Sequence, residues 1–341
     1  MRAAILRAPG HVDVGHVPDP RIEHPSDAVV RVVAAGICGT DLRGYQGRPG
    51  PVQGPACGHE FVGVVASVGR DVRTVRPGQP VVAPFMFSDG DCVQCVRGMQ
   101  SSCQNGGMWG VAAGGGQADG VRVPFADGTL LPVPLDEHDE RVPAVLTLAD
   151  VMATGHHAIH ASAGRKPATV AVVGDGAVGL CAVLAAQRAG IERIFLIGHH
   201  EMRLRIGHKF GATDLVSAQG AEGWTQVIEA TGGAGADLVV EAVGEQGAMD
   251  TAMAVCADGG AISTVGGPHG VLDSMACFLR NVTVTGGLAP ARAYLPALLD
   301  DVVAGRLDPS PIFDHTVQLA CVDSGYQAMV DRQATKVLIT L

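Results

Sequence analysis

The chain has 341 residues and a formal net charge of −10, and hydrophobic residues make up 47% of it. This length suggests about two domains, with enough apolar material for two cores. The acidic balance argues against nucleic acid as a partner, and no uninterrupted apolar run is long enough for a membrane span.

The cysteine content indicates a reducing compartment. Nine cysteines are present, and the first residues lead directly into a strand-like segment instead of the apolar core of a signal peptide. Without a secretion signal, an odd number of cysteines is typical of metal ligands or buried thiols. We therefore expect a cytoplasmic protein without a disulfide framework.

The N-terminal part predicts a mainly β, barrel-like domain. Short β-like runs alternate with Pro and Gly, at Ala3 to Leu6, Val12 to Val17, Ala28 to Ala35, Phe61 to Val65 and Val81 to Ala83. Residues 86–120 have no clear periodicity and contain three cysteines, so we interpret them as a long functional loop.

The pattern changes to strand–helix–strand further along the chain. Residues 142–166 are expected to form a helix that crosses into a second domain, and the strands expected after it are 170–173, 194–197, 237–241, 260–265 and 282–285. Helices such as 201–210 and 246–257 lie between them. This alternation predicts a doubly wound parallel α/β sheet over residues 151–285. A helix at 293–304 and strands at 313–319 and 336–340 then return to the first domain, which comprises residues 1–150 and 286–341.

The segment Thr169 to Gln187 has the form of a nucleotide-binding turn. A β-branched run precedes the G-x-G-x-x-G sequence Gly174-Asp175-Gly176-Ala177-Val178-Gly179, and a breaker-free apolar run follows it. In such a turn Gly174 permits the bend, Gly176 lets a pyrophosphate approach the backbone, and Gly179 lets helix pack on strand. The helix N-terminus then offers free N–H groups to phosphates. A glycine-rich turn that binds nothing is the alternative, because 47 residues are glycine.

Four separated motifs occur together in one order. They are Gly36-Ile37-Cys38-Gly39-Thr40-Asp41, Gly58-His59-Glu60, the cysteines of the long loop and the glycine-rich turn. In this order and spacing the chain resembles the zinc-dependent medium-chain alcohol dehydrogenases over essentially its whole length. The resemblance implies a GroES-like catalytic domain, a Rossmann domain, zinc and a nicotinamide cofactor.

The resemblance implies a catalytic zinc held by Cys38, His59 and Asp150, with Asp150 at a position where some relatives have cysteine. Glu60 is implied to be a neighbouring carboxylate that approaches the metal when the substrate position is vacant. Thiolate, imidazole and carboxylate are accepted zinc ligands. Each of these residues alone would have an ordinary structural explanation.

The loop 89–103 resembles the structural zinc lobe of the same family. The family usually supplies four cysteines, whereas this chain supplies Asp89, Cys92, Cys95 and Cys103. A carboxylate can replace a thiolate as a zinc ligand. The alternative is a loop with reduced thiols and no metal.

Other positions follow from the family pattern. Thr40 matches the hydroxyl residue that binds the substrate oxygen and begins a proton relay, but Arg43 stands where some relatives continue that relay with histidine. Asp41 is expected to orient His59. Trp109 either lines the substrate pocket or belongs to the core.

Two further histidines, His156 and His157, follow the expected third ligand. Either one lines the nicotinamide pocket, or both lie on a helix face without such a role.

The end of the second Rossmann strand favours NADP over NAD. NAD-preferring domains place Asp or Glu there to bind the ribose 2′-hydroxyl, whereas this chain has Gly198, followed by His199, His200 and Arg203. Glu201 is the acidic residue that could take the ribose role instead. Gly198→Asp is expected to shift the preference toward NAD.

These features together predict reversible hydride transfer between a small secondary or primary alcohol and NAD(P). A polyol dehydrogenase and a non-catalytic nucleotide-binding protein are the alternatives. The expected partners are a small-molecule alcohol, aldehyde or ketone and further copies of the chain, as a homodimer or homotetramer.

Overall fold

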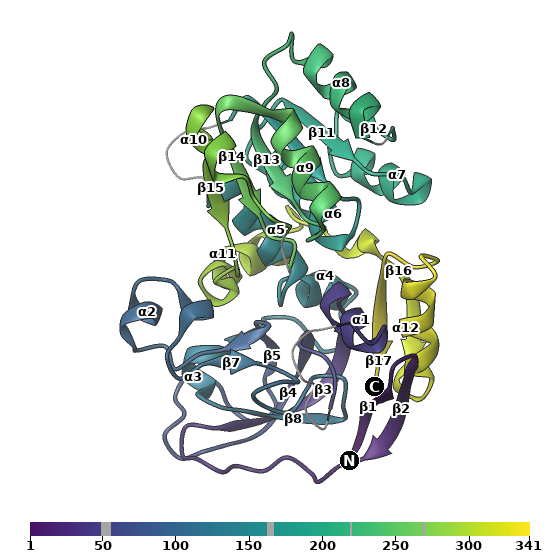
Figure 1. Cartoon of the computed structure of the whole chain (residues 1–341). Helices are drawn as coiled ribbons and strands as arrows, with labels where there is room; N and C mark the ends of the chain where they lie inside the picture. Colours follow the sequence, from purple (N-terminus) through teal and green to yellow (C-terminus); the bar gives the residue numbers. More distant parts are fainter. Residues whose placement is uncertain (49–55, 162–166, 219, 268–269) are drawn as a thin grey trace. The chain divides into compact units, whose positions relative to one another are not determined.

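A computed structural model describes residues 1–48, 56–161, 167–218, 220–267 and 270–341 of the chain. These residues form two compact units. Unit 1 comprises Met1–Ala153 and Pro290–Leu341, and unit 2 comprises Thr154–Ala289 (Figure 1). The sequence predicts divisions after residues 150 and 285, and these two units divide after Ala153 and Ala289.

Unit 1 is built on a seven-stranded sheet with the order β16-β17-β3-β4-β5-β9, in which β8 also pairs with β3. The strands are β3 (Ala28–Ile37), β4 (Phe61–Val68), β5 (Pro80–Ala83), β8 (Gly120–Val123), β9 (Leu131–Pro132), β16 (Phe313–Gln318) and β17 (Lys336–Thr340). Two further pairs are β1 (Arg2–Ala8) with β2 (His11–His16), and β6 (Met86–Phe87) with β7 (Gly107–Met108).

The register of this sheet determines where the polar turns meet. Strand β3 runs antiparallel to both β4 and β17, with Ala35 opposite Phe61 and Ile37 opposite Val337. The residues that follow β3, precede β4 and begin β17 therefore lie together at one end of these three neighbouring strands. This arrangement gathers side chains from three distant parts of the sequence.

Short helices cover and connect the strands of unit 1. They are α1 (Gly39–Tyr45), α2 (Val93–Val96), α3 (Ala126–Thr129), α4 (Val142–Thr147), α11 (Ala291–Val303) and α12 (Val322–Val330), with 3₁₀ turns at Gln100–Ser102, Ser310–Ile312 and Leu319–Cys321. The core of the unit includes the buried side chains of Phe61, Val65, Trp109, Tyr326 and Val337. Helix α5 (Val151–His160) leads from unit 1 into unit 2.

Unit 2 contains a six-stranded parallel sheet with the order β12-β11-β10-β13-β14-β15. Its strands are β10 (Thr169–Val173), β11 (Arg193–Ile197), β12 (Asp214–Val216), β13 (Ala236–Glu241), β14 (Cys256–Thr264) and β15 (Thr283–Gly286). In chain order this is the 3-2-1-4-5-6 arrangement of the Rossmann fold. The predicted doubly wound fold is confirmed.

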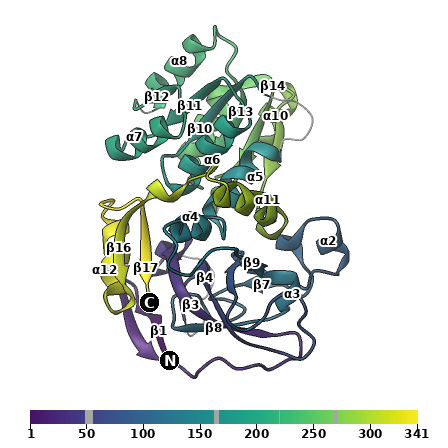
Figure 2. The ribbon, with the colours of Figure 1, turned by 180° about the vertical axis from the view of Figure 1, so that it is seen from behind.

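Helices flank this sheet (Figure 2). They are α6 (Ala177–Arg188), α7 (Glu201–Lys209), α8 (Gly220–Ala230), α9 (Gln246–Val255) and α10 (Ser274–Leu279). Helix α6 packs on β10 and β11, while α9 packs on β13, β10 and β14. The buried faces of the strands are rich in β-branched and aromatic residues, as expected for a sheet covered on both sides.

The structure differs from the predicted elements in three places. The loop 86–120 contains the short elements β6, α2 and β7, which lack the length to give a periodic pattern. The expected helix over 142–166 is two helices, α4 and α5, and residues 162–166 lie outside the described residues. The expected helix 246–257 ends at Val255, because β14 begins at Cys256 and contains an irregularity near Gly259, which has a φ of +74°.

No helix among the described residues has the length and apolar character to cross a membrane.

Candidate functional site

Four side chains converge in unit 1, where β3 ends and β4 begins. Cys38 follows β3 at the start of α1, His59 and Glu60 immediately precede β4, and Asp150 immediately precedes α5. One ligand atom from each lies within 4.8 Å of the others, and all four residues are buried. The structure therefore brings together every residue expected around the catalytic metal.

The contacts within this group are polar and close. Cys38 Sγ donates a hydrogen bond to Asp150 Oδ2 at 3.3 Å, and His59 Nε2 lies 3.2 Å from the same oxygen. Burial by itself raises the pKa of Asp150, but the hydrogen bond and charge of His59 bring it below its usual value. The site thus presents a charged carboxylate, an imidazole and a thiol to one point.

Burial, followed by the negative charge of Asp150, raises the pKa of the Cys38 thiol. A divalent cation at this point has the opposite influence and favours the thiolate. The mixed sulfur, nitrogen and oxygen donor set is one that zinc accepts. These residues therefore fit a zinc ion.

The fourth member, Glu60, is held by Lys336 at the start of β17. Lys336 Nζ donates a hydrogen bond to Glu60 Oε1 at 2.8 Å and lies 2.7 Å from Oε2, and both side chains are fully buried. Burial raises the pKa of Glu60, while Lys336 acts against that shift. Gly36 provides the room, because a Cβ there would lie 2.1 Å from Glu60 Oε2.

Lys336 was not predicted from the sequence as a site residue. Its signal was present, since it is a charged residue that begins the strand Lys336–Thr340 and is followed there by three apolar residues. Burial alone lowers the pKa of Lys336, yet the charge of Glu60 raises it overall. The ammonium form of Lys336 is therefore favoured, and it faces both oxygens of the Glu60 side chain.

Thr40 lies in the first turn of α1 and is exposed. Its hydroxyl is 3.8 Å from Cys38 Sγ, which places it beside the four-residue group. Asp41, in the same turn, is buried, and its Oδ1 lies 3.3 Å from His59 Nδ1. Arg43 lies one turn further along α1. The expected contact between Asp41 and His59 is thus present.

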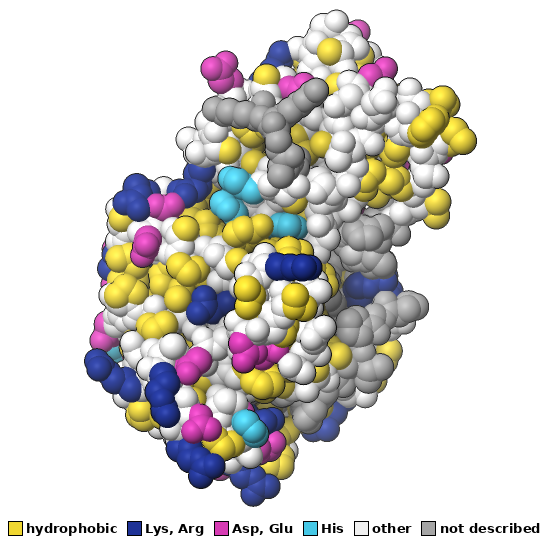
Figure 3. All heavy atoms as spheres, turned by 90° about the vertical axis from the view of Figure 1, so that its left-hand side faces the viewer, with side chains coloured by type: hydrophobic (Ala, Val, Ile, Leu, Met, Phe, Trp, Pro, Cys, Tyr) yellow, Lys and Arg dark blue, Asp and Glu magenta, His cyan; other side chains and the backbone are white. Residues whose placement is uncertain are grey.

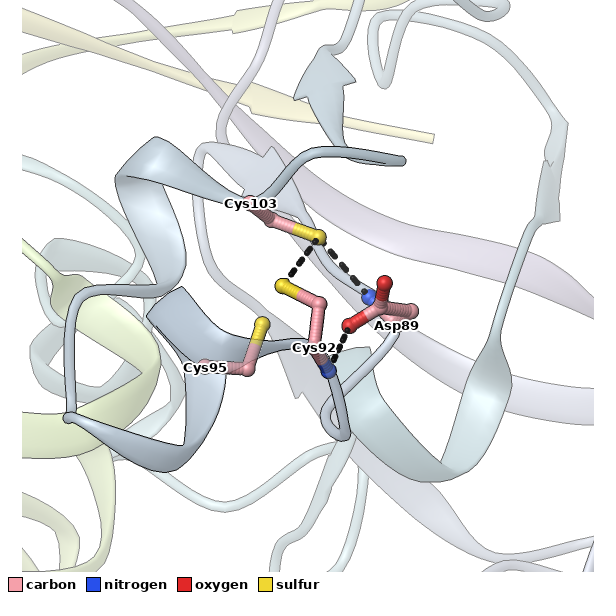
Figure 4. A group of neighbouring side chains, drawn as sticks. All are labelled: Asp89, Cys92, Cys95 and Cys103. Carbon is pink, nitrogen blue, oxygen red and sulfur yellow. Dashed lines mark hydrogen bonds between the residues drawn. The ribbon is translucent and has the colours of Figure 1, made fainter.

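A second ligand group occurs in the loop 89–103. Asp89, Cys92, Cys95 and Cys103 turn their side chains toward one another (Figure 4), with ligand atoms within 4.8 Å. Cys92 Sγ and Cys103 Sγ are 3.8 Å apart. Partial burial raises the pKa of Asp89, but hydrogen bonds from the Cys92 backbone and from Asn105 outweigh it and hold the carboxyl in its charged form. Three thiols and a carboxylate also fit a zinc ion.

All nine cysteines are free. Four of them, Cys38, Cys92, Cys95 and Cys103, belong to these two groups.

The glycine-rich turn of unit 2 has the predicted geometry. Gly174 follows β10 with a φ of +113°, a conformation that favours glycine. A Cβ on Gly179 would lie 1.9 Å from the Gly174 carbonyl oxygen, so only glycine permits this packing. A Cβ on Gly176 would meet nothing within 4 Å, and α6 begins at the next residue, Ala177. The turn thus leaves open space in front of a helix N-terminus.

The side chain of Asp175, a residue of that turn, lies beside the residues that follow the second strand, β11. Its Oδ2 accepts hydrogen bonds from the backbone N–H groups of His199 and His200 at 2.9 Å, and His200 Nδ1 also lies 2.9 Å away. Arg203 Nη1 is 3.8 Å from its Oδ1. Burial raises the pKa of Asp175, but the hydrogen bonds from His200 outweigh it and keep the carboxyl charged.

The sequence did not predict a carboxylate at this position, because Asp175 belongs to the first turn and not to the second strand. A Cβ on Gly198 would lie 2.5 Å from Asp175 Cβ and Oδ2. Residue 198 has no acidic side chain, but the carboxylate of Asp175 lies beside it. Gly198→Asp would also collide with Asp175, so it is not a clean test of cofactor preference.

Trp109 belongs to the core of unit 1. It is 1% exposed, its Nε1 donates to the Pro84 carbonyl at 2.7 Å, and its ring contacts Phe61 and Phe87. Of its two expected roles, the structure supports the core tryptophan.

The two histidines of α5 differ in their surroundings. His157 is buried, with Nε2 3.1 Å from the Gly286 carbonyl, whereas the His156 ring stacks on His160.

Comparison with known proteins identifies the class. Residues 24–134 match the family model of the alcohol dehydrogenase GroES-like domain, and residues 177–304 match that of zinc-binding dehydrogenases. The chain is 36% identical over 332 residues to a protein of Mycobacterium tuberculosis named as a probable zinc-binding alcohol dehydrogenase, covering 96% of this chain and 84% of that one. A zinc-type alcohol dehydrogenase of Aspergillus flavus is 32% identical, covering 99% and 81%.

Solved structures agree with this class. An alcohol dehydrogenase from a Thermus species has a TM-score of 0.90 and 33% identity, and the match covers 100% of this chain and 99% of that one. A zinc-binding dehydrogenase from Sinorhizobium meliloti, bound to NADP, has a TM-score of 0.82 and 25% identity, covering 100% and 99%. The chain belongs to the zinc-dependent medium-chain alcohol dehydrogenase family. It is an oxidoreductase with a GroES-like and a Rossmann domain, and its family uses zinc and a nicotinamide cofactor.

Proposed function

We propose that the chain catalyses reversible hydride transfer between a small secondary or primary alcohol and NAD(P). The observation that carries this proposal is the convergence of four buried ligand atoms within 4.8 Å in unit 1. In the proposed site Cys38, His59 and Asp150 hold the zinc. Glu60, held by Lys336, would be the neighbouring carboxylate that can approach the metal when the substrate position is vacant.

A zinc ion held by these residues would supply Lewis-acid chemistry and would lower the pKa of the substrate hydroxyl. The chain supplies the path for the proton of that hydroxyl. The Thr40 hydroxyl hydrogen-bonds the substrate oxygen and accepts the first proton, a type of step that contributes roughly 10²–10⁴-fold to rates. Its exposure beside Cys38 supports this role. Because Arg43 follows where histidine would continue the relay, we propose that ribose hydroxyls or water complete it.

A second, structural zinc is proposed in the loop 89–103. The support is the closed set of Cys92, Cys95, Cys103 and the charged Asp89 carboxylate (Figure 4). Structural zinc sites are four-coordinate and have no open position. The expected zinc content is therefore two ions per chain.

The proposed cofactor is NADP in preference to NAD. The glycine-rich turn and the N-terminus of α6 receive the pyrophosphate, with Ala177 and Val178 in the first turn of that helix. Support for a 2′-phosphate comes from the basic residues His199, His200 and Arg203 beside residue 198, and the same three residues contact the Asp175 carboxylate. The NADP-bound relative from Sinorhizobium meliloti supports the same preference.

We also propose that the chain forms a homodimer or homotetramer. Strand β15 is the last strand of the unit 2 sheet, and Thr283 and Val284 in it are exposed. Apolar side chains near it are exposed as well, among them Phe278 at 76%, and hydrophobic side chains are visible on the surface in Figure 3. Unpaired sheet edges and apolar patches of this kind mark contacts between protein chains. A second copy can pair with the same edge across a two-fold axis.

Light scattering after size-exclusion chromatography tests this assembly. Phe278→Asp is expected to give monomers, whereas Met202→Asp, at an exposed apolar position of α7, is expected to leave the oligomer intact. An oligomer unaffected by Phe278→Asp would contradict the proposed interface.

A substrate panel tests the proposed reaction. Primary, secondary and polyol substrates are compared by their kcat/KM values. The kcat/KM values for NAD and for NADP are then measured at a saturating concentration of the alcohol. Oxidation of a simple alcohol, with a higher kcat/KM for NADP, is the expected result. A strong preference for polyols would favour the polyol alternative, and binding of cofactor without turnover on any substrate would favour a non-catalytic nucleotide-binding protein.

A further inference from the structure

A buried chain of hydrogen bonds leads from the C-terminal helix α12 to the candidate zinc ligand His59. It passes through Tyr326, Gln117 and Asp41. We propose that Gln117 and Tyr326 are positioning residues that fix the Asp41 carboxylate, and through it the His59 ring, and so determine how slowly zinc leaves this site. This inference rests on the proposed zinc site of unit 1.

The contact between His59 and Asp41 orients the imidazole ring. Asp41 Oδ1 lies 3.3 Å from His59 Nδ1, and a carboxylate can only accept a hydrogen bond. Nδ1 therefore carries the proton that faces Asp41. When Nε2 is a zinc ligand, this is the proton that the neutral ring keeps. Histidine ligands of metals are generally held by such a partner on the other ring nitrogen.

The second oxygen of Asp41 is held by two donors. The Cys38 backbone N–H donates to Oδ2 at 3.0 Å, and Gln117 Nε2 donates to the same oxygen at 3.4 Å. Asp41 is 3% exposed and Gln117 is 0% exposed, so water does not replace either bond easily. The orientation of the carboxylate thus depends on Gln117 as well as on α1.

The neighbours of Gln117 determine which way its amide faces. Nε2 also donates to the Gly36 carbonyl at 3.0 Å, and both Gly36 O and Asp41 Oδ2 are acceptors. The NH₂ group must therefore face them, which leaves Oε1 to accept the Tyr326 hydroxyl at 2.8 Å. Every bond in the chain consequently has one direction, from Tyr326 to Gln117 to Asp41.

Packing holds both ends of this chain in place. Tyr326 is 1% exposed and stacks on Tyr45 of α1 at 5.2 Å between ring centroids. Gly58, directly before His59, has a φ of +88°, and a Cβ there would lie 2.4 Å from Gln117 Cγ. The segment that carries His59 is thus shaped around the Gln117 side chain.

Removing the Gln117 amide therefore leaves the Asp41 carboxylate, which orients His59, less firmly held. In Gln117→Met a side chain of similar length loses both hydrogen bonds from Nε2, and Asp41 keeps only the Cys38 N–H on Oδ2. Loss of a partner that orients a metal ligand typically costs about 10–100-fold in metal affinity. Tyr326→Phe removes a bond one step further away and leaves the Gln117 amide in place, so its effect is expected to be smaller.

Zinc release from the full-length protein tests the inference. Wild type, Gln117→Met, Tyr326→Phe and Asp27→Asn are mixed with an excess of a chromogenic chelator, and the release phases are recorded. A Cys95→Ala variant, which lacks a ligand of the loop 89–103, identifies the phase of that loop. Asp27 is the matched control, because it is a buried carboxylate of unit 1 that binds Arg122 and the backbone of residues 23–24 and does not belong to the chain of bonds.

Release from the site of Cys38, His59 and Asp150 is expected to be about 10–100-fold faster in Gln117→Met. It should accelerate to a lesser degree in Tyr326→Phe and stay unchanged in Asp27→Asn. The phase of the loop 89–103 should be the same in all four proteins. The cobalt(II)-substituted protein gives a second readout, since the ligand-field bands of the one-thiolate site are expected to shift in Gln117→Met and not in Asp27→Asn.

Equal release from this site in wild type and Gln117→Met, with unshifted cobalt bands, would overturn the inference. Equal acceleration in Asp27→Asn would also overturn it, because the effect would then reflect general loss of stability. If Gln117→Met does not fold, Tyr326→Phe decides alone on the same two readouts. A wild-type protein that holds zinc only in the loop 89–103 would instead contradict the proposed function, and Cys95→Ala distinguishes that outcome.

Discussion

The buried pair of Lys336 and Glu60 leads to a prediction about stability. Lys336 is 1% exposed and Glu60 is 0% exposed, and Lys336 Nζ also donates to the Ile37 carbonyl at 3.3 Å. Replacing Lys336 by methionine keeps the side-chain length and removes the ammonium. The Glu60 carboxylate then remains buried beside Asp150 without its cation.

The expected cost is large because the Glu60 side chain is fully buried. Breaking a buried ion pair by removing one partner costs about 3–5 kcal/mol, out of a total unfolding free energy of about 5–15 kcal/mol. With an m-value near the upper end for urea, about 3 kcal/mol/M, the unfolding midpoint of unit 1 should fall by roughly 1–2 M. Glu60→Met should be costly for the same reason, since it leaves the ammonium unpaired.

The double variant Lys336→Met/Glu60→Met separates charge from packing. Replacing both partners of a buried pair by apolar residues is often neutral or stabilising, so the double variant should be more stable than either single one. Arg2→Met is the control for loss of a cation from unit 1. Its pair with Asp119 is solvent-exposed and is expected to contribute little.

The assay follows urea unfolding by the fluorescence of Trp109, which is buried in unit 1. The chain has two tryptophans, and Trp224→Phe in all samples removes the signal of unit 2. Zinc is kept at the same excess throughout. A loss below about 1 kcal/mol in Lys336→Met, or additive losses in the double variant, would refute the account of this pair.

Three further outcomes are expected. Thr40→Ala should depress alcohol oxidation by roughly 10²–10⁴-fold while Thr40→Ser stays mild, and equal activity of the two variants would contradict a role for the hydroxyl. Cys103→Ala should lower both the zinc content by one ion and the melting temperature, and an unchanged melting temperature together with one zinc in the wild type would contradict the structural zinc. Arg203→Ala should raise the KM for NADP more than that for NAD, and equal increases would argue against a 2′-phosphate contact.

The fold and most of the site could be predicted from the sequence because their signals are local. The β-branched run before Gly174 and the spacing of Gly176 and Gly179 define a strand–turn–helix unit without any information from elsewhere in the chain. Cys38, His59 and Asp150 likewise lie next to strand or helix ends. Their convergence follows once β3 and β4 pair in the observed register.

The residues that sequence reasoning missed act through contacts between distant segments. Lys336 reaches Glu60 across 276 positions, and Tyr326 reaches Gln117 across 209. No periodicity or motif relates such residues, since only the sheet register and the packing of α12 bring them together. Asp175 was missed for a related reason, because its carboxylate fills the space at residue 198, which follows the neighbouring strand β11.

Short elements were also beyond prediction. Strands β6 and β7 have two residues each, and β12 has three, so alternation cannot be recognised in them. The predicted cytoplasmic location, which rests on the cysteine content, stays a prediction.

Zinc analysis of Cys38→Ala alongside its turnover tests the central claim most directly. Wild type is expected to hold two zinc ions per chain and to oxidise an alcohol with NAD(P). Cys38→Ala should hold one zinc, retained by the loop 89–103, and should lose turnover while its Rossmann unit still binds cofactor. A Cys38→Ala protein that keeps both zinc ions and near-normal turnover would contradict the proposed site.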